Sequence, residues 1–225
     1  MQFTISRDAI IKPLQLAAGV VERRHTLPVL ANVLLTLKDD ILEITGTDLE
    51  VELIGRVPVN SGSRPGEITV PGRKLMDICK SLSDDAVLDF SLEDGKFVVK
   101  AGRSRFTLAT LPASDFPVTV DEPGTYEIGI SGQELKHLID SCAFAMAQQD
   151  VRYYLNGMLF ELGSSWFRVV ATDGHRLAMH TTGISTGVDD VQQIIVPRKG
   201  VLELSRLLSE PSEDELVLVF GAGHI

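Results

Sequence analysis

Residues 68–82 read ITVPGRKLMDICKSL, and residues 194–208 read IIVPRKGVLELSRLL. In both stretches a β-branched run ends in Val-Pro and is followed at once by apolar residues at helical spacing. Two stretches with the same order of strand, Val-Pro and helix indicate two copies of one structural unit, at an offset of about 125 residues.

Other segments match at nearly the same offset and in the same order: FTISRDAI (3–10) with EIGISGQEL (127–135), LANVLLTL (30–37) with LNGMLFEL (155–162), and the Thr-Asp pairs at 47–48 and 172–173. Because chance rarely keeps several matches in order, we interpret the chain as a duplicated domain. We expect a first domain at residues 1–120 and a second at 126–225.

Each copy is predicted to contain two amphipathic helices, at 6–24, 72–82, 132–148 and 198–208. Ser131 is the expected N-cap of the third helix, with Glu134 completing a capping box. Pro13 should kink or delay the first helix. Alternating β-branched runs at 41–59 and 87–111, the latter with an Asp94-Gly95 turn, predict antiparallel strands. The fold class is therefore α+β, with two helices packed on antiparallel sheet in each copy.

The second copy is shorter than the first. About thirty residues follow the strand AVLDF in the first copy, whereas the chain stops soon after the matching LVLVF at 216–220. We expect the second domain to be truncated before its last strands, and the chain to be a fragment of a longer protein.

Composition excludes several classes of protein. No apolar run approaches the roughly 18 residues of a membrane helix, and the start MQFTISRD lacks the features of a signal peptide. Cys79 and Cys142 lie in helical patterns rather than in a spaced cluster, so they predict reduced core thiols and neither a zinc site nor a disulfide. We expect a cytoplasmic protein with no cofactor, metal or membrane partner.

The charge is distributed unevenly along the chain. The formal net charge is −10, which by itself argues against a nucleic-acid partner. The four predicted helices, however, hold eleven basic and six acidic residues, so they sum to +5 and the remaining residues to −15. This pattern is typical of helices that face a polyanion, although a merely solvated basic face has the same composition.

Several long strings resemble the β sliding clamp family, the processivity subunits of bacterial DNA polymerase III: TLPVLANVLL, ITGTDLE, AGRSRFTLATLPASDFP, QQDVRYYLNGMLFE, ATDGHRLA and VPRKGV. The resemblance implies a DNA clamp fold in a non-catalytic protein. In the family a ring of two identical subunits, each with three copies of the domain, encircles duplex DNA without reading its sequence. The third clamp domain is then absent from this chain.

The resemblance also assigns a pocket for short linear peptides from DNA polymerase and clamp-loader subunits. In the two copies Thr-Asp is shared, which indicates a strand-end turn capped by the aspartate, but the next three residues differ. The positions that match the family's pocket are Leu155, Thr172, Gly174, His175, Arg176 and Leu177.

Two further groups of residues follow from the resemblance. Positions that touch DNA in the family are Arg24, Arg73, Gln149, Tyr153 and Tyr154, although half-buried strand packing remains an alternative for the two tyrosines. The ring-closing contact of a homodimer is assigned to Lys74, Lys96, Arg103, Arg105, Phe106 and Leu108.

Three other interpretations remain open. The chain could be a duplicated peptide-binding scaffold without a DNA role, or a hydrolase centred on Asp173 and His175. The segment containing His175 could also be only a turn.

Overall fold

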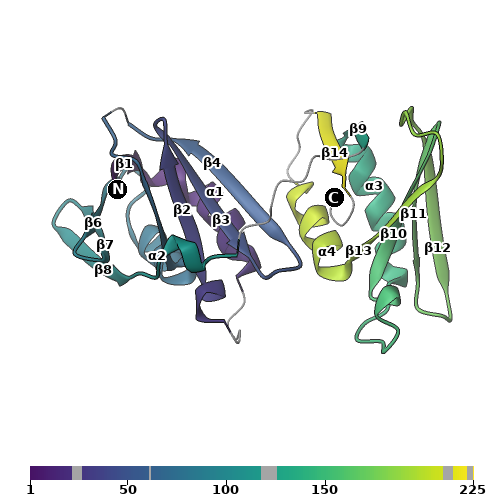
Figure 1. Ribbon diagram of the computed structural model, residues 1–225, viewed down its shortest axis with the longest axis horizontal. Coiled ribbons are helices and arrows are strands. Elements are labelled where there is room, and N and C mark those ends of the chain that lie inside the picture. The colour runs from purple at the N-terminus through teal and green to yellow at the C-terminus, as the bar shows by residue number, and fades with distance from the viewer. Residues whose placement is uncertain (22–26, 61, 118–125, 210–214, 222–224) are drawn as a thin grey trace. The chain divides into compact units, whose positions relative to one another are not determined.

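The structure is a computed structural model that describes residues 1–21, 27–60, 62–117, 126–209, 215–221 and 225. The chain divides into two compact units, Met1–Thr119 and Val120–Ile225 (Figure 1). Of the predicted site residues, only Arg24 lies outside the described residues.

The first unit contains two antiparallel four-stranded sheets, with strand orders β1-β6-β7-β8 and β4-β3-β2-β5. Its elements are β1 (Gln2–Ser6), α1 (Arg7–Val20), η1 (Pro28–Ala31), β2 (Asn32–Lys38), β3 (Ile41–Thr47), β4 (Glu52–Pro58), β5 (Gly66–Pro71), α2 (Gly72–Ser81), β6 (Val87–Glu93), β7 (Lys96–Ala101), β8 (Ser104–Ala109) and η2 (Ala113–Asp115).

The second unit repeats this order with an antiparallel four-stranded sheet, β12-β11-β10-β13, and a two-stranded sheet, β14-β9. Its elements are β9 (Tyr126–Ser131), α3 (Gly132–Cys142), η3 (Ala143–Ala145), η4 (Tyr153–Leu155), β10 (Gly157–Gly163), β11 (Trp166–Thr172), β12 (Leu177–Gly183), β13 (Gln192–Pro197), α4 (Arg198–Leu207) and β14 (Glu215–Phe220). The predicted class, α+β with helices on antiparallel sheet, is confirmed.

Each unit has its own hydrophobic core, to which helices and sheets contribute apolar side chains. The apolar faces of the predicted amphipathic helices point toward these cores. Ile10, Leu14 and Ala17 of α1 are buried, and so are Leu135, Leu138 and Ile139 of α3. Both cysteines are free and buried, and burial raises the pKa of the Cys79 thiol to about 11, so it stays protonated at neutral pH.

Helix α1 packs directly against two glycines of its sheet. A Cβ on Gly46 of β3 would lie 1.9 Å from the Ala17 carbonyl oxygen, and one on Gly55 of β4 would lie 2.6 Å from Pro13 Cβ. Pro13 does not delay the helix, which begins at Arg7 and includes it, so that part of the prediction is wrong. The packing of Pro13 against the sheet at Gly55 stabilises a helix that its ring would weaken in isolation.

Local signals set the element boundaries. The Ser131 hydroxyl accepts a hydrogen bond from the Glu134 N–H at 3.2 Å, which confirms the predicted N-cap. The Glu134 carboxylate accepts a hydrogen bond from Thr182 of β12. Asp94 and Gly95, at φ 48° and 72°, form the predicted two-residue turn between β6 and β7.

None of the helices in the described ranges is long and apolar enough to cross a membrane.

Candidate functional site

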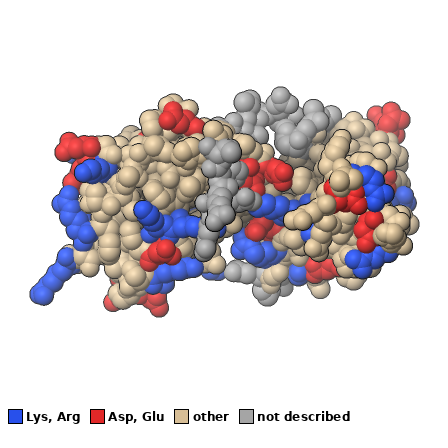
Figure 2. Space-filling view, turned by 90° about the horizontal axis from the view of Figure 1, so that it is seen from below, with Lys and Arg blue, Asp and Glu red and all other residues tan. Residues whose placement is uncertain are grey.

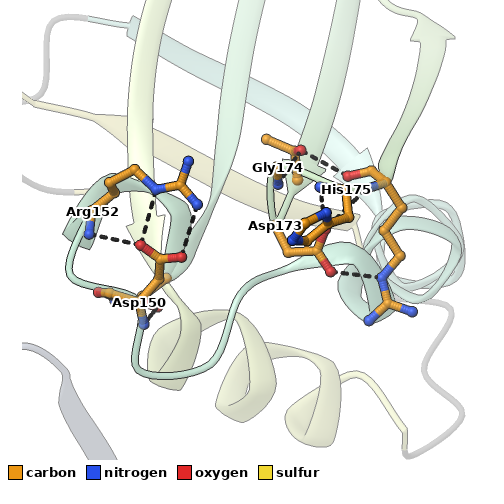
Figure 3. A network of polar contacts seen from close by, with 8 residues as sticks. Asp150, Arg152, Asp173, Gly174 and His175 are labelled. Atoms are coloured by element: carbon orange, nitrogen blue, oxygen red, sulfur yellow. Dashed lines mark hydrogen bonds and ion pairs between the residues drawn. The ribbon is translucent and has the colours of Figure 1, made fainter.

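The segment TDGHR, residues 172–176, forms a tight turn between β11 and β12 (Figure 3). The Thr172 hydroxyl accepts a hydrogen bond from the Gly174 N–H at 3.1 Å and donates one to the Arg176 carbonyl at 2.7 Å. The Asp173 carboxylate accepts from the N–H groups of His175 and Arg176, each at 2.9 Å. Two side chains therefore satisfy the backbone groups of the turn.

The first unit builds the same turn between β3 and β4. The Thr47 hydroxyl accepts from the Leu49 N–H and donates to the Val51 carbonyl, each at 3.0 Å. The Asp48 carboxylate accepts from the N–H groups of Glu50 and Val51, at 3.0 and 2.8 Å. The prediction of a strand-end turn capped by its aspartate is confirmed in both copies.

The side chains on the second turn distinguish it from the first. The Arg176 Nε donates to Asp173 at 3.0 Å, and the guanidinium lies 5.6 Å from the centroid of the Phe144 ring. Leu177 follows at the start of β12 with 65% of its surface exposed. The turn and the neighbouring Phe144 of η3 thus present an oriented cation, an aromatic ring and an exposed aliphatic side chain, which suits recognition of a partly apolar segment.

Asp173 is unsuited to the role of a general base. Hydrogen bonds from the backbone N–H groups of Arg176 and His175 lower the pKa of its carboxyl group, so it stays ionised and bound to the turn. The described ranges contain no group of three or more His, Cys, Asp or Glu residues that could hold a metal ion. The Asp173 carboxylate is therefore a structural acceptor of the turn, and it does not supply the base of the hydrolase hypothesis.

A second polar cluster lies beside the turn, in the loop that leads to β10 (Figure 3). The Asp150 carboxylate accepts from the backbone N–H, Nε and Nη2 of Arg152, at 2.8, 3.0 and 2.9 Å. These hydrogen bonds lower the pKa of Asp150 to about 2. The Arg152 guanidinium covers Gly174, where an added Cβ would lie 3.2 Å from Nη2. The loop and the turn are thus in contact.

The same loop presents the predicted DNA-contacting tyrosines. Tyr153 and Tyr154 lie in η4 rather than in a strand, with 83% and 50% of their surfaces exposed. Their ring centroids are 5.9 Å apart at an interplanar angle of 78°. Leu155, which follows them, is 8% exposed. Of the two predicted apolar pocket residues, Leu177 therefore offers surface to a ligand, while Leu155 packs inside the unit.

Comparison with known families accounts for both units. The model of the DNA polymerase III beta subunit N-terminal domain matches residues 1–121, and the model of the central domain of the same subunit matches residues 129–225. The chain belongs to the DNA polymerase III beta subunit family. It is 59% identical to a beta sliding clamp of Pseudomonas aeruginosa and 45% identical to that of Escherichia coli, over its whole length in both comparisons. It spans 61% of the length of each relative.

Solved structures of the beta subunit family agree with this membership. A crystal structure of the DNA polymerase III subunit beta from Pseudomonas aeruginosa superposes with a TM-score of 0.95 at 59% identity, covering 98% of this chain and 60% of the other. A Caulobacter crescentus pol III beta superposes with a TM-score of 0.89 at 39% identity, covering 97% and 61%. The fold predicted from the resemblance is thereby confirmed.

The basic residues that the family resemblance assigned to α2 lie on an exposed part of the first unit. Arg73 and Lys74 are exposed in the first turn of the helix. Arg73 Nη2 donates to the Val21 carbonyl at 2.9 Å, which orients the guanidinium. A hollow of about 390 Å³ beside it is also lined by Gln15 and Lys80. The two cations that line the hollow, Arg73 and Lys80, outnumber its one carboxylate, Asp77, which favours an anionic group there.

The residues assigned to ring closure occupy β8 and its surroundings. In the described residues β8 pairs only with β7, so its outer edge has free backbone groups. Arg105 points outward and bonds Glu93 at 2.9 Å, and Arg103 and Lys96 are exposed. The side chains of Leu108, which is buried, and Phe106, which is half-buried, pack in the core of the first unit. The backbone edge and the cations, rather than these apolar side chains, are what β8 presents.

Sequence reasoning missed the residues that organise the loop, Asp150, Arg152 and Asn156, and it also missed Phe144, which lies beside Arg176 of the turn. The spacing of Asp150 and Arg152 is too short for a helical ion pair, and the pairing depends on the loop conformation. One signal was readable in the repeat. Asn156 stands where the first copy has Ala31, so it is specific to the second copy.

Proposed function

We propose that the full-length protein is a sliding clamp, the processivity factor of the bacterial replicative DNA polymerase. The observation that carries the proposal is the match of both units to consecutive domains of the DNA polymerase III beta subunit. In this role the protein is not an enzyme. It closes a homodimeric ring around duplex DNA and so keeps the polymerase on its template.

The charge of the helices supports a DNA-facing role. The four α-helices in the described residues hold nine basic and five acidic residues, a net charge of +4 against −10 for the chain, so the remaining residues of the chain sum to −14. Figure 2 shows basic and acidic side chains interspersed on both units rather than one unbroken basic surface. A surface with interspersed charges makes only weak direct contacts with phosphates, and encirclement explains how an acidic protein stays on DNA.

The two ends of the ring contact are proposed to differ in charge. The β8 edge with Lys74, Lys96, Arg103 and Arg105 supplies the basic half, and an acidic surface of the second subunit supplies the other. Free backbone groups on β8 favour the addition of a strand from that subunit.

Partner proteins are proposed to bind at the turn between β11 and β12. Gly174, His175, Arg176 and Leu177 form the wall that receives a short linear peptide from the polymerase or the clamp loader. Leu177 contacts an apolar anchor of the peptide, and the oriented Arg176 contacts its polar groups.

The decisive experiment compares circular with linear DNA. The full-length protein is loaded onto a nicked plasmid by its clamp loader and separated from free protein by gel filtration at high salt. A ring is retained on the circle and lost when a restriction enzyme linearises it, because only topology holds it. Equal retention on both forms would contradict encirclement. Peptide binding without retention on either form would favour the peptide-binding scaffold.

A further inference from the structure

We propose that Asn156 is a positioning residue that holds the DNA-facing tyrosine loop, residues 149–155, in its binding conformation. The inference rests on the proposed function, because it gives a role to a residue that supports the proposed DNA contacts Gln149, Tyr153 and Tyr154. Asn156 itself lies half-buried behind them, at the end of the loop.

The Asn156 side chain closes the loop with two hydrogen bonds to one residue. Its Oδ1 accepts from the Asp150 N–H at 2.9 Å, and its Nδ2 donates to the Asp150 carbonyl at 2.8 Å. An amide is the only kind of side chain that offers an acceptor and a donor side by side on neutral groups. The two bonds join the ends of a loop whose regular secondary structure is the single short 3-10 helix η4.

The backbone of Asn156 connects this loop to the rest of the unit. Its N–H donates to the Tyr153 carbonyl at 3.0 Å, and its carbonyl accepts from the N–H of Arg198 at 2.9 Å. Arg198 is the first residue of α4, one of the basic helices. The loop conformation is therefore set relative to a helix that is also proposed to face DNA.

The exposed residues of the loop cannot hold this conformation by burial. Tyr153 is 83% exposed and Val151 is 97% exposed, so neither side chain packs in the hydrophobic core. Leu155 is the one buried side chain of the loop, so burial does not fix the residues proposed to contact DNA, and the conformational freedom that they lose on binding opposes binding. Polar bonds formed before binding remove part of that cost, so the clasp at Asn156 preorganises the two tyrosines for contact.

Comparison of the two copies indicates that the fold itself does not require an amide at position 156. The first unit places Ala31 at the equivalent position, directly before β2, as Asn156 directly precedes β10. The first unit therefore forms a 3-10 helix and strand with alanine at this position, and the amide of the next residue, Asn32, bonds Thr69 of β5 instead of a loop. An amide that only the second copy carries at this position, beside the loop with the exposed tyrosines, serves the loop.

The test measures DNA binding by the full-length protein, using fluorescence anisotropy with a labelled primed duplex at low salt. Asn156→Ala should bind about five- to tenfold more weakly, while its Tm stays within about 2 °C of wild type, because alanine is accepted at this position in the first unit. Asn156→Asp keeps the acceptor but places an oxygen against the Asp150 carbonyl, so it should be as weak as Asn156→Ala. Gln193→Ala, which removes an amide bonded to Glu161 on the sheet, is the matched control and should bind as wild type.

A double-mutant cycle shows whether Asn156 acts through the tyrosines. In a Tyr153→Ala, Tyr154→Ala background, Asn156→Ala should cause less than a twofold further loss, since nothing remains to be positioned. Additive losses, wild-type binding by Asn156→Asp, or a large drop in the Tm of Asn156→Ala would each overturn the proposal. If the tyrosine variants are weak but Asn156→Ala binds normally, the inference fails and the clamp proposal stands. If the tyrosine variants also bind normally, the proposed DNA contacts of the loop fail as well.

Discussion

One position in the Thr-Asp turns has the same left-handed backbone conformation in both copies but is occupied by different residues. Gly174 has φ 88° in the second copy, and Leu49 has φ 78° at the matching place in the first. Glycine adopts this left-handed region without strain, whereas a branched side chain does so at a cost of roughly 1–2 kcal/mol. The first copy tolerates that cost because Thr47 and Asp48 hold the turn from both sides.

The first prediction compares two substitutions at this position, of which only the one in the second copy should lower the free energy of unfolding. Gly174→Ala should lower the free energy of unfolding of the second unit by about 1 kcal/mol, since it adds a strained Cβ that also approaches Arg152. Leu49→Gly should leave that of the first unit unchanged or raise it by up to about 1 kcal/mol. Urea unfolding followed by circular dichroism measures both. Destabilisation by both substitutions would show that the left-handed conformation is not the source of strain.

A second prediction concerns the loop carboxylate Asp150. Hydrogen bonds from Arg152 hold its folded pKa at about 2, below the ordinary value of 3.8. Its contribution to stability is therefore fully present above about pH 4 and is lost as the pH falls through about 2. The urea midpoint of the wild type should fall more steeply between these pH values than that of Asp150→Asn. Parallel curves for the two proteins would contradict the assignment.

At the scale of secondary-structure elements, the packing of α1 on its sheet depends on glycines that no helical or strand propensity favours. Gly46 and Gly55 lie inside β3 and β4, where glycine weakens a strand. They are present because Ala17 and Pro13 of α1 occupy the space that a side chain would fill. The close contact of helix and sheet offsets the loss of strand propensity.

The third prediction tests this contact. Gly46→Ala should destabilise the first unit by about 2–3 kcal/mol, because its Cβ would overlap the Ala17 carbonyl and α1 would have to move. Gly183→Ala is the control, since no atom lies within 4 Å of the added Cβ, and it should change stability by less than about 0.5 kcal/mol. Chemical unfolding of the two variants measures the difference. Equal effects would exclude close packing as the reason for Gly46.

At the scale of the whole molecule, the two units share one fold but present different surfaces. The first unit offers a basic α2 and the free edge of β8, and the second offers the tyrosine loop and the turn with Leu177. Duplication supplies a stable scaffold twice, and the residues that differ between copies carry the separate proposed roles.

The fourth prediction separates partner binding from DNA encirclement in the full-length protein. Leu177→Asp should weaken the binding of a partner peptide about a thousandfold, because peptide contact would bury an unpaired carboxylate. Retention on circular DNA should be unchanged. Val191→Asp, at another exposed apolar residue of the second unit, should bind the peptide normally. Calorimetric titration provides the affinities, and unchanged affinity in a folded Leu177→Asp variant would withdraw the pocket assignment.

The sequence by itself determined the duplicated α+β unit, its helices and the Thr-Asp turns. These features depend on periodicity and on contacts within a few residues, so they can be predicted from the order of residues alone. The Ser131 cap and the turns at Asp48 and Asp173 are examples.

Only the tertiary structure decided where the site residues point and what holds them. The pattern of the β8 strand did not reveal that Leu108 lies in the core of its own unit, and that of the pocket did not reveal that Leu155 is buried. The hydrogen bonds between Asn156 and Asp150 and the position of the Arg152 guanidinium next to Gly174 depend on the path of an irregular loop. Such contacts arise when the chain folds back on itself, and residue spacing does not encode that geometry.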